Sequence, residues 1–241
     1  MNLSPTIPGM RALVATIHAV GCLFLASVPA RAAEKAATPN PSTPAAATPS
    51  AQAKSTSAPA VTWKSLFDGK TLAGWKVTDF AGHGEVGVEN GELRLGNGSM
   101  TGVTWTNELP KMNYEISLEA KRVEGSDFFC GLTFPVGKEP CSLIVGGWGG
   151  GVVGLSSLDG QDAANNETTR YMTFKTGQWY HVRLQVTPKA ITAWVDNDKV
   201  VEVETEGKSI SIRLEMEMSK PLGIATWSTA AALRNIKARP L

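Results

Sequence analysis

Residues 114–121 read YEISLEAK, and their alternation of apolar and polar side chains decides the fold class. Every second residue is apolar, which is the period of a β-strand with one buried face. The same period recurs in 180–186 (YHVRLQV), 190–197 (AITAWVDN) and 209–218 (SISIRLEMEM). Turn-forming stretches rich in Gly, Asn and Asp separate these runs, and no convincing helix of ten residues is seen. The sequence therefore predicts an all-β fold, an antiparallel two-sheet sandwich or jelly roll.

A glycine-rich run, LIVGGWGGGVVGL at 143–155, contains a formal G-x-G-x-x-G match from Gly149 to Gly154. A dinucleotide site needs a helix that opens on this motif, but a loop-like stretch, SSLDGQDAANNETTR, follows it. No Gly-Lys-Ser/Thr closes the run, which excludes a P-loop. We interpret the run as two buried strands that meet at a glycine-rich bend. Trp148 at this bend is either a core plug or a platform on which a flat ligand can lie.

The first 62 residues are predicted to be targeting and spacer segments. Residues 1–32 contain an apolar run of about 17 residues and an Ala-x-Ala ending, as in a secretory signal peptide, with an uncleaved anchor as the alternative. Residues 33–62 are mostly Ala, Pro, Ser and Thr, and such a spacer stays disordered because it cannot bury a core. We expect one ordered domain at 63–241, in a secreted, periplasmic or cell-envelope protein without a membrane span after cleavage.

The charge balance argues against nucleic acid as a partner. Cleavage after residue 32 would remove Arg11 and Arg31, leaving 21 basic residues against 22 acidic ones. The sequence also has no cluster of Lys and Arg residues, and a nucleic-acid-binding surface needs such a cluster.

Cys130 and Cys141 remain after cleavage, and an exported chain with an even number of cysteines favours a disulfide. They flank GLTFPVGKEP, which reads as two strand ends joined by a turn. The sequence therefore predicts an intramolecular Cys130–Cys141 disulfide. Two buried free thiols are the alternative.

Three further segments resemble one family of secreted bacterial proteins. SLFDGKTLAGWKV (65–77), VENGELRLG (88–96) and LGIATWSTAAALRNIKA (222–238) are laid out as in the 3-keto-disaccharide hydrolases. The resemblance spans roughly 63–241 and implies a concanavalin-like jelly roll. It also implies cleavage of 3-keto-glycosides by elimination and hydration. In that reaction a base removes the C2 proton, an enolate forms, the aglycone leaves C1 and water adds there.

At three places the chain departs from the pattern of that family. The family strand of the Tyr-Glu-Val-Gln type corresponds to CSLIVGGW, which has no carboxylate. The His of a Gln-Asp-His-Gly-type segment aligns with Trp227, and the Arg of a Ser-Gly-Ile-Phe-Phe-Arg strand aligns with Pro135. The resemblance thus predicts the fold, while the usual catalytic carboxylate and His are expected to be replaced.

The remaining polar and aromatic residues supply a candidate site. The catalytic candidates are His83 in a Gly-flanked loop, Asp127 before the Cys130 strand, and Glu215, which would share a strand face with Glu217. The substrate-binding candidates are Trp148, Asp159, Asn166, Arg170 and Trp227. The oxygen-rich loop 159–167 could hold a divalent cation such as Ca²⁺, although its spacing matches no EF-hand.

Three functions remain open at this point. The first is an enzyme acting on 3-keto-glycosides. The second is a non-catalytic carbohydrate-binding module whose platform is Trp148 with Trp227 or Trp194. The third is a cell-surface structural or interaction domain. A saccharide ligand belongs to the first two, and polar side chains around Trp148 would favour the first.

Overall fold

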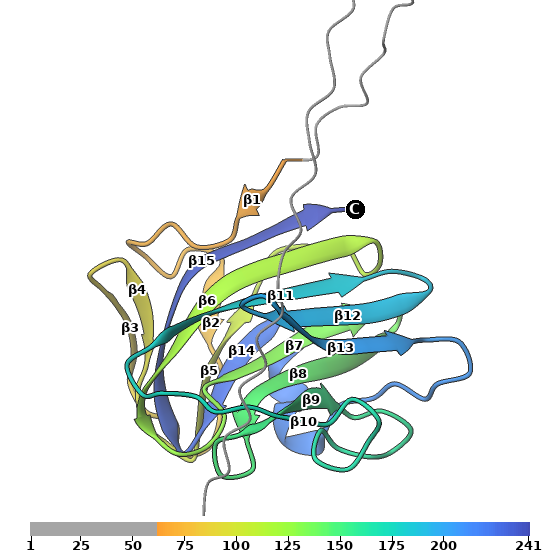
Figure 1. The fold of residues 1–241 in the computed structure, drawn as a ribbon. Coiled ribbons are helices and arrows are strands. Elements are labelled where there is room, and N and C mark those ends of the chain that lie inside the picture. The colour runs from red at the N-terminus through yellow and green to blue at the C-terminus, as the bar shows by residue number, and fades with distance from the viewer. Residues whose placement is uncertain (1–61) are drawn as a thin grey trace, which may run out of the picture. The chain divides into compact units, whose positions relative to one another are not determined.

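Two antiparallel β-sheets packed face to face make up residues 62–241, the part of the chain that this computed structural model describes (Figure 1). The predicted all-β sandwich is therefore confirmed. The predicted signal peptide and all but the last residue of the predicted spacer lie outside the described residues.

One sheet has eight strands in the order β13-β12-β11-β6-β15-β4-β3, with β1 paired to β15. Its strands are β1 (Lys64–Ser65), β3 (Val86–Glu89), β4 (Glu92–Leu95), β6 (Tyr114–Gly125), β11 (Trp179–Val186), β12 (Ala190–Val195), β13 (Asp198–Glu204) and β15 (Thr229–Pro240).

The other sheet has seven strands in the order β10-β9-β8-β7-β14-β5-β2. Its strands are β2 (Trp75–Val77), β5 (Met100–Trp105), β7 (Cys130–Val136), β8 (Glu139–Gly147), β9 (Val152–Ser156), β10 (Arg170–Tyr171) and β14 (Gly223–Trp227). Sequence neighbours often pair within a sheet, but β14 lies between β5 and β7, so the chain returns across the sandwich before it ends.

The core lies between the sheets and follows from the two-residue period of the strands. Leu118 of β6 and Leu184 of β11 face Leu132 of β7 and Leu143 of β8, and all four are fully buried. The turns predicted from composition also form. β3 and β4 are joined at Asn90 and Gly91, both with positive φ, as a tight Asn-Gly hairpin requires.

The outer face of the seven-stranded sheet is covered by two chain segments, 157–169 and 209–219. Phe128, Ile144, Met216 and Ala225 form a second buried cluster under this cover. Gly131 makes room for it, because a Cβ there would lie 2.9 Å from the Phe128 ring and 3.3 Å from Cε of Met216. The cover leaves one end of this face open.

The predicted strand at 209–218 is wrong. Leu214–Ser219 instead form a short 3₁₀ helix, η1, preceded by a loop. Only its first residues pair, in an isolated antiparallel bridge between Ile210 and Leu158, and the residues that follow cross the face of the sheet without joining it. Only Met216 of the helix's apolar residues is buried, while Leu214 is 84% exposed. Glu215 and Glu217 therefore do not share the face of a strand.

The predicted disulfide between Cys130 and Cys141 is also wrong, because both thiols are free and buried. The hairpin they flank does form, but its tight turn sets the register. Cys141 lies opposite Phe134, and Cys130 lies opposite Val145. The two cysteines are therefore four residues apart along the ladder, roughly 13 Å at strand rise, which is too far for a disulfide.

We expect both thiols to be inert in the folded protein. Burial raises the pKa of each thiol to about 12, so almost no thiolate is present at neutral pH. In a variant lacking residues 1–32, which removes Cys22, a thiol reagent should label neither cysteine before unfolding and both after it. The Tm should be the same with and without a reductant. A reductant-sensitive Tm or a linked peptide pair would contradict the register.

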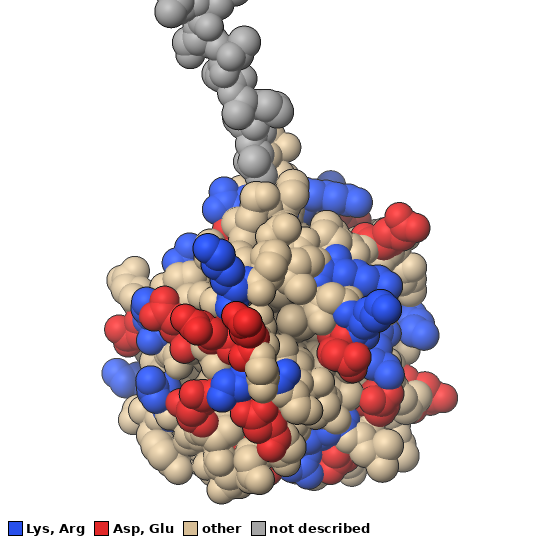
Figure 2. All heavy atoms as spheres, turned by 90° about the vertical axis from the view of Figure 1, so that its right-hand side faces the viewer, with Lys and Arg blue, Asp and Glu red and all other residues tan. Residues whose placement is uncertain are grey.

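Figure 2 shows acidic and basic side chains interspersed on this face, with no extended surface of one sign. No helix within residues 62–241 is long and apolar enough to cross a membrane.

Candidate functional site

A cavity of about 260 Å³ opens at the uncovered end of the seven-stranded sheet. Four segments that are distant in sequence build it: the β6–β7 loop, the β8–β9 turn, the end of β14 and the η1 segment. Its lining residues are Met100, Asp127, Phe128, Ile144, Trp148, Ser156, Arg213, Glu215, Met216 and Trp227. Four of these, namely Asp127, Trp148, Glu215 and Trp227, are among the residues predicted for the site.

Trp148 sits in the glycine-rich turn between β8 and β9, and its indole is 43% exposed. Its φ of +48° places it in the left-handed region, which costs a non-glycine residue roughly 1–2 kcal/mol. Gly147 and Gly149 flank it, so the turn could have used glycine here as well. The turn therefore does not require an indole at this position, which points to a role outside folding.

Asp127 lies in the β6–β7 loop, half-buried beside this turn. One carboxylate oxygen accepts a hydrogen bond from the Phe128 amide at 2.7 Å, and the other accepts one from the Gly149 amide at 3.2 Å. Within residues 62–241 no Lys, Arg or His side chain forms an ion pair with it. Asp127 is thus oriented by backbone amides and keeps a carboxylate facing the cavity.

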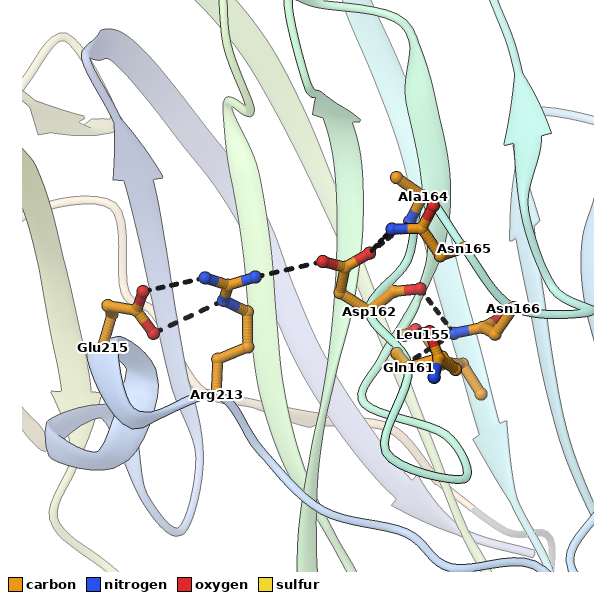
Figure 3. A network of polar contacts seen from close by, with 8 residues as sticks. All are labelled: Leu155, Gln161, Asp162, Ala164, Asn165, Asn166, Arg213 and Glu215. Carbon is orange, nitrogen blue, oxygen red and sulfur yellow. Dashed lines mark hydrogen bonds and ion pairs between the residues drawn. The ribbon is translucent and has the colours of Figure 1, made fainter.

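Glu215 is held very differently, by Arg213 (Figure 3). The guanidinium donates to both carboxylate oxygens of Glu215, at 2.9 and 3.4 Å, and from its other side to Asp162 at 3.1 Å. These bonds from Arg213 hold the pKa of Glu215 below its ordinary value, and Glu215 in turn raises the pKa of Arg213. Glu215 therefore remains an anion and is a poor proton donor, and the pair acts as one polar unit.

The floor of the cavity is apolar. Phe128, Ile144 and Met216 are buried beneath it, and Trp227 stands 40% exposed at its edge. The rings of Phe128 and Trp227 are tilted by 41° with centroids 6.4 Å apart. The Ser156 hydroxyl also lines the cavity and is buried, with no hydrogen-bond partner among the described residues. An apolar pocket with a few fixed polar groups is typical of a small-molecule site.

The tryptophans on the other sheet are covered by cations. Arg183 lies 3.8 Å from the ring centre of Trp194, Arg234 and Lys121 flank the ring of Trp179, and Lys237 and Arg239 flank that of Trp63. Such rings are already engaged in cation–π contacts. Trp148 and Trp227 carry no such cation among residues 62–241. Trp194, the alternative platform partner, therefore lies outside the site.

Four predicted site residues do not reach the cavity. His83 lies on an exposed loop, where Nδ1 contacts the Gly84 carbonyl. Asp159 pairs with Lys208, and Arg170 donates to its neighbour, the Thr169 carbonyl. Asn166 donates to the backbone carbonyls of Leu155, Gln161 and Asp162 (Figure 3).

The loop at 159–167 does not fit the expected divalent-cation site. Asp159 and Glu167 both pair with Lys208, and Asp162 pairs with Arg213, so its carboxylates are neutralised by side chains. Within residues 62–241 no three His, Cys, Asp or Glu side chains come together to hold a metal ion.

Asn166 instead holds its loop together by hydrogen bonds to the backbone. Replacing Asn166 should therefore destabilise the domain. Replacing it with Ala leaves three backbone carbonyls without their donor, at about 1 kcal/mol or more each. We expect Asn166→Ala to lower the free energy of unfolding by about 2–4 kcal/mol, measured by urea denaturation. Asn165→Ala, an exposed neighbour, is the matched control. Equal stability of the two variants would contradict this role.

The fold and the cavity together define a class: a β-sandwich domain with an aromatic and carboxylate-lined pocket on its seven-stranded sheet. More narrowly, the chain belongs to the family of 3-keto-alpha-glucoside-1,2-lyase-like domains, whose profile matches residues 62–239. This confirms the family resemblance of the sequence. Trp227 lines the cavity, and Pro135 lies in β7 away from it.

Solved structures of low identity share the fold. A candidate glycosyl hydrolase from Parabacteroides distasonis ATCC 8503 is 17% identical with a TM-score of 0.50, covering 74% of this chain and 94% of that one. The transglycosylase Crh5 in complex with NAG is 12% identical with a TM-score of 0.50, covering 74% and 83%. A Bacillus subtilis protein of unknown function with a galectin-like fold is 9% identical with a TM-score of 0.50, covering 70% and 90%. No curated protein matches the sequence significantly.

Proposed function

We propose that the domain binds a 3-keto-glycoside in the cavity beside Trp148 and cleaves it by elimination and hydration. One observation carries the proposal: an exposed indole is held at a backbone angle that favours glycine, next to a carboxylate that forms no ion pair within residues 62–241. Family membership names the substrate class. The cavity holds about 260 Å³, close to the lower end of the roughly 300–1,000 Å³ of ligand pockets, which suits a single sugar ring.

The two exposed indoles would position the sugar. The faces of a pyranose ring carry C–H groups, and these pack well on aromatic rings. Trp148 provides one such surface and Trp227 the edge of the other. The apolar floor of Phe128 and Met216 excludes water, which strengthens each polar interaction above it.

Asp127 would be the general base. The ketone at C3 acidifies the C2 proton, and the Asp127 carboxylate takes this proton. The C2 electron pair forms the enolate, the C1–O bond breaks, and the enone remains. Protonated Asp127 then passes its proton to the departing oxygen, so that it is a carboxylate again when the aglycone leaves.

Arg213 would stabilise the enolate. A guanidinium carries five N–H groups, and three of these bind Glu215 and Asp162. One N–H on each terminal nitrogen remains for the oxygen at C3 of the ligand. The two carboxylates fix the direction of these N–H groups before the substrate arrives, and a preorganised donor of this kind lowers the barrier to charge development.

Hydration would complete the reaction with the same groups. Asp127 takes a proton from water, the hydroxide adds to C1 of the enone, and the resulting enolate is protonated at C2 by Asp127. The net reaction is hydrolysis of the 3-keto-glycoside, with no redox change. The predicted signal peptide supports a further proposal, that this chemistry takes place outside the cytoplasm.

A non-catalytic saccharide-binding module is the second candidate. It is favoured by the sequence at the family's usual polar positions, where this chain has Trp227 and the carboxylate-free strand CSLIVGGW.

The two candidates are separated by measuring binding and aglycone release on the same sample. Residues 33–241 are incubated with a 4-nitrophenyl 3-keto-glucoside and with its unoxidised parent. Saturable release of nitrophenol from the keto compound alone is expected for the enzyme. Binding without release identifies the module, and neither binding nor release contradicts both.

A further inference from the structure

Arg122 of β6 is a buried arginine without an acidic partner in the described structure. It is 5% exposed, and none of the ion pairs formed within residues 62–241 includes it. Its terminal Nη2 lies 3.1 Å from the carbonyl oxygen of Asp127, 3.2 Å from that of Gly146 and 3.0 Å from that of Gly150. Three carbonyls, one from the β6–β7 loop, one from the end of β8 and one from the turn after it, thus converge on one nitrogen.

This arrangement lowers the stability of the folded domain. Burial lowers the pKa of Arg122, because the charged guanidinium loses water, and the nearby Asp127 charge, which forms no ion pair with it, offsets this only in part. Its Nε has no hydrogen-bond partner among the described residues, and the group lies 5.0 Å from the ring centre of Phe129. An apolar side chain in this place would remove the cost of a buried, unpaired charge.

The glycines of the turn are shaped around the same group. A Cβ on Gly146 would lie 2.7 Å from Nη2 of Arg122, and one on Gly150 would lie 3.4 Å from it. Both glycines have positive φ, which turns their carbonyls toward the guanidinium. Two carbonyls of the glycine-rich run, those of Gly146 and Gly150, therefore face the cationic side chain of Arg122.

We propose that Arg122 is a positioning residue for the candidate site. It ties the loop that carries Asp127 to the turn that carries Trp148, and so sets the distance between the base and the platform. Arg122 does not line the cavity, so it would not touch the substrate. The catalytic part of this inference rests on the proposed function, while the positioning part does not.

The positioning is tested by chemical rescue. Arg122→Ala leaves a cavity of the shape of a guanidinium ion between the three carbonyls. We expect affinity for the 3-keto-glucoside to fall about tenfold or more, as for the loss of charged hydrogen bonds. Guanidinium chloride at millimolar, non-denaturing concentration should restore it, and urea, a neutral molecule of the same shape, should not. Arg183→Ala, at an arginine on the same sheet, should bind normally without any added ion.

A second readout needs no ligand. The indole N–H resonance of Trp148 in a ¹H–¹⁵N spectrum should move or broaden in Arg122→Ala, and guanidinium should return it to its original position. If no glycoside binds the parent protein, this readout still decides the positioning role. An unchanged Trp148 resonance in Arg122→Ala, or a shift that guanidinium and urea reverse equally, would overturn the proposal. Should Arg122→Ala not fold, Arg122→Lys is used. It keeps the charge but cannot span three carbonyls, so Trp148 must again shift.

Discussion

Replacing Asp127 with Asn is expected to slow the turnover of a 3-keto-glycoside by about 100- to 10,000-fold, the loss typical of a missing general base. The change removes the charge and keeps the shape. The Asn carbonyl can still accept the Phe128 amide, while the contact to Gly149 is lost. Because only one hydrogen bond is lost, the binding free energy should fall by about 1 kcal/mol, which weakens the affinity only a few-fold. Steady-state release of nitrophenol gives kcat and KM separately.

Asp159→Asn is the control for this variant. Asp159 is exposed, pairs with Lys208 and lies outside the cavity, so its turnover should equal that of the parent. Unchanged kcat in Asp127→Asn would remove Asp127 from the mechanism. If the affinity fell as much as the turnover, Asp127 would be a residue that shapes the pocket and not the general base.

Replacing Trp148 with Gly is expected to weaken saccharide binding about 30-fold or more while leaving the fold intact. Removing a tryptophan at the centre of a binding site typically costs 2 kcal/mol or more of binding free energy, about 30-fold in Kd. Stability should barely change. Glycine relieves the left-handed backbone at φ = +48°, which offsets the greater freedom it gives the unfolded chain. We expect a Tm within a few degrees of the parent.

The size of the Tm change tests the competing role for Trp148. A buried core tryptophan would cost about 3–5 kcal/mol on truncation, a drop of roughly 10 °C or more in a domain of this size. Trp194→Ala, on the far sheet beneath Arg183, is the control for binding and should leave Kd unchanged. A large decrease in Tm for Trp148→Gly would show that the indole packs into the core and stabilises the fold. Weaker saccharide binding by Trp194→Ala would instead place the binding site on the other sheet.

The strands could be predicted because a half-buried strand repeats every two residues, and most of this chain obeys that period. YEISLEAK became β6, with Ile116 and Leu118 in the core, and the Asn90–Gly91 hairpin formed where its turn residues stand. The same period failed at 209–218. Alternation records which side chains are apolar, but not whether a neighbouring strand is free to pair, and that depends on the whole sheet.

The disulfide prediction failed for a related reason. Spacing along the chain places Cys130 and Cys141 near one turn, whereas bonding depends on the register of the hairpin. A turn centred near Gly137 puts Phe134, not Cys130, opposite Cys141. Two strand residues must lie almost opposite each other to be bridged.

The candidate site could be predicted in part. Trp148 was found because it stands alone among glycines, and Asp127 because it introduces the strand beside that turn. Asp159, Asn166 and Arg170 come from a polar loop, but Asp159 binds Lys208, while Asn166 and Arg170 donate to backbone carbonyls, so none of the three faces the cavity. Arg213 and Arg122 were missed, because nothing local distinguishes an arginine that pairs across more than fifty residues, or one that is buried without a partner, from a surface one.

The most direct test of the central claim, that saccharide binds between Trp148 and Trp227, is a titration followed through the indole N–H resonances. The chain has seven tryptophans, so seven indole signals report on the whole domain at once. Addition of a 3-keto-glucoside should move the signals of Trp148 and Trp227, assigned from their single variants, and leave those of Trp63, Trp179 and Trp194 in place. Movement of those three signals, with Trp148 and Trp227 unchanged, would contradict the account and place the ligand on the outer face of the eight-stranded sheet.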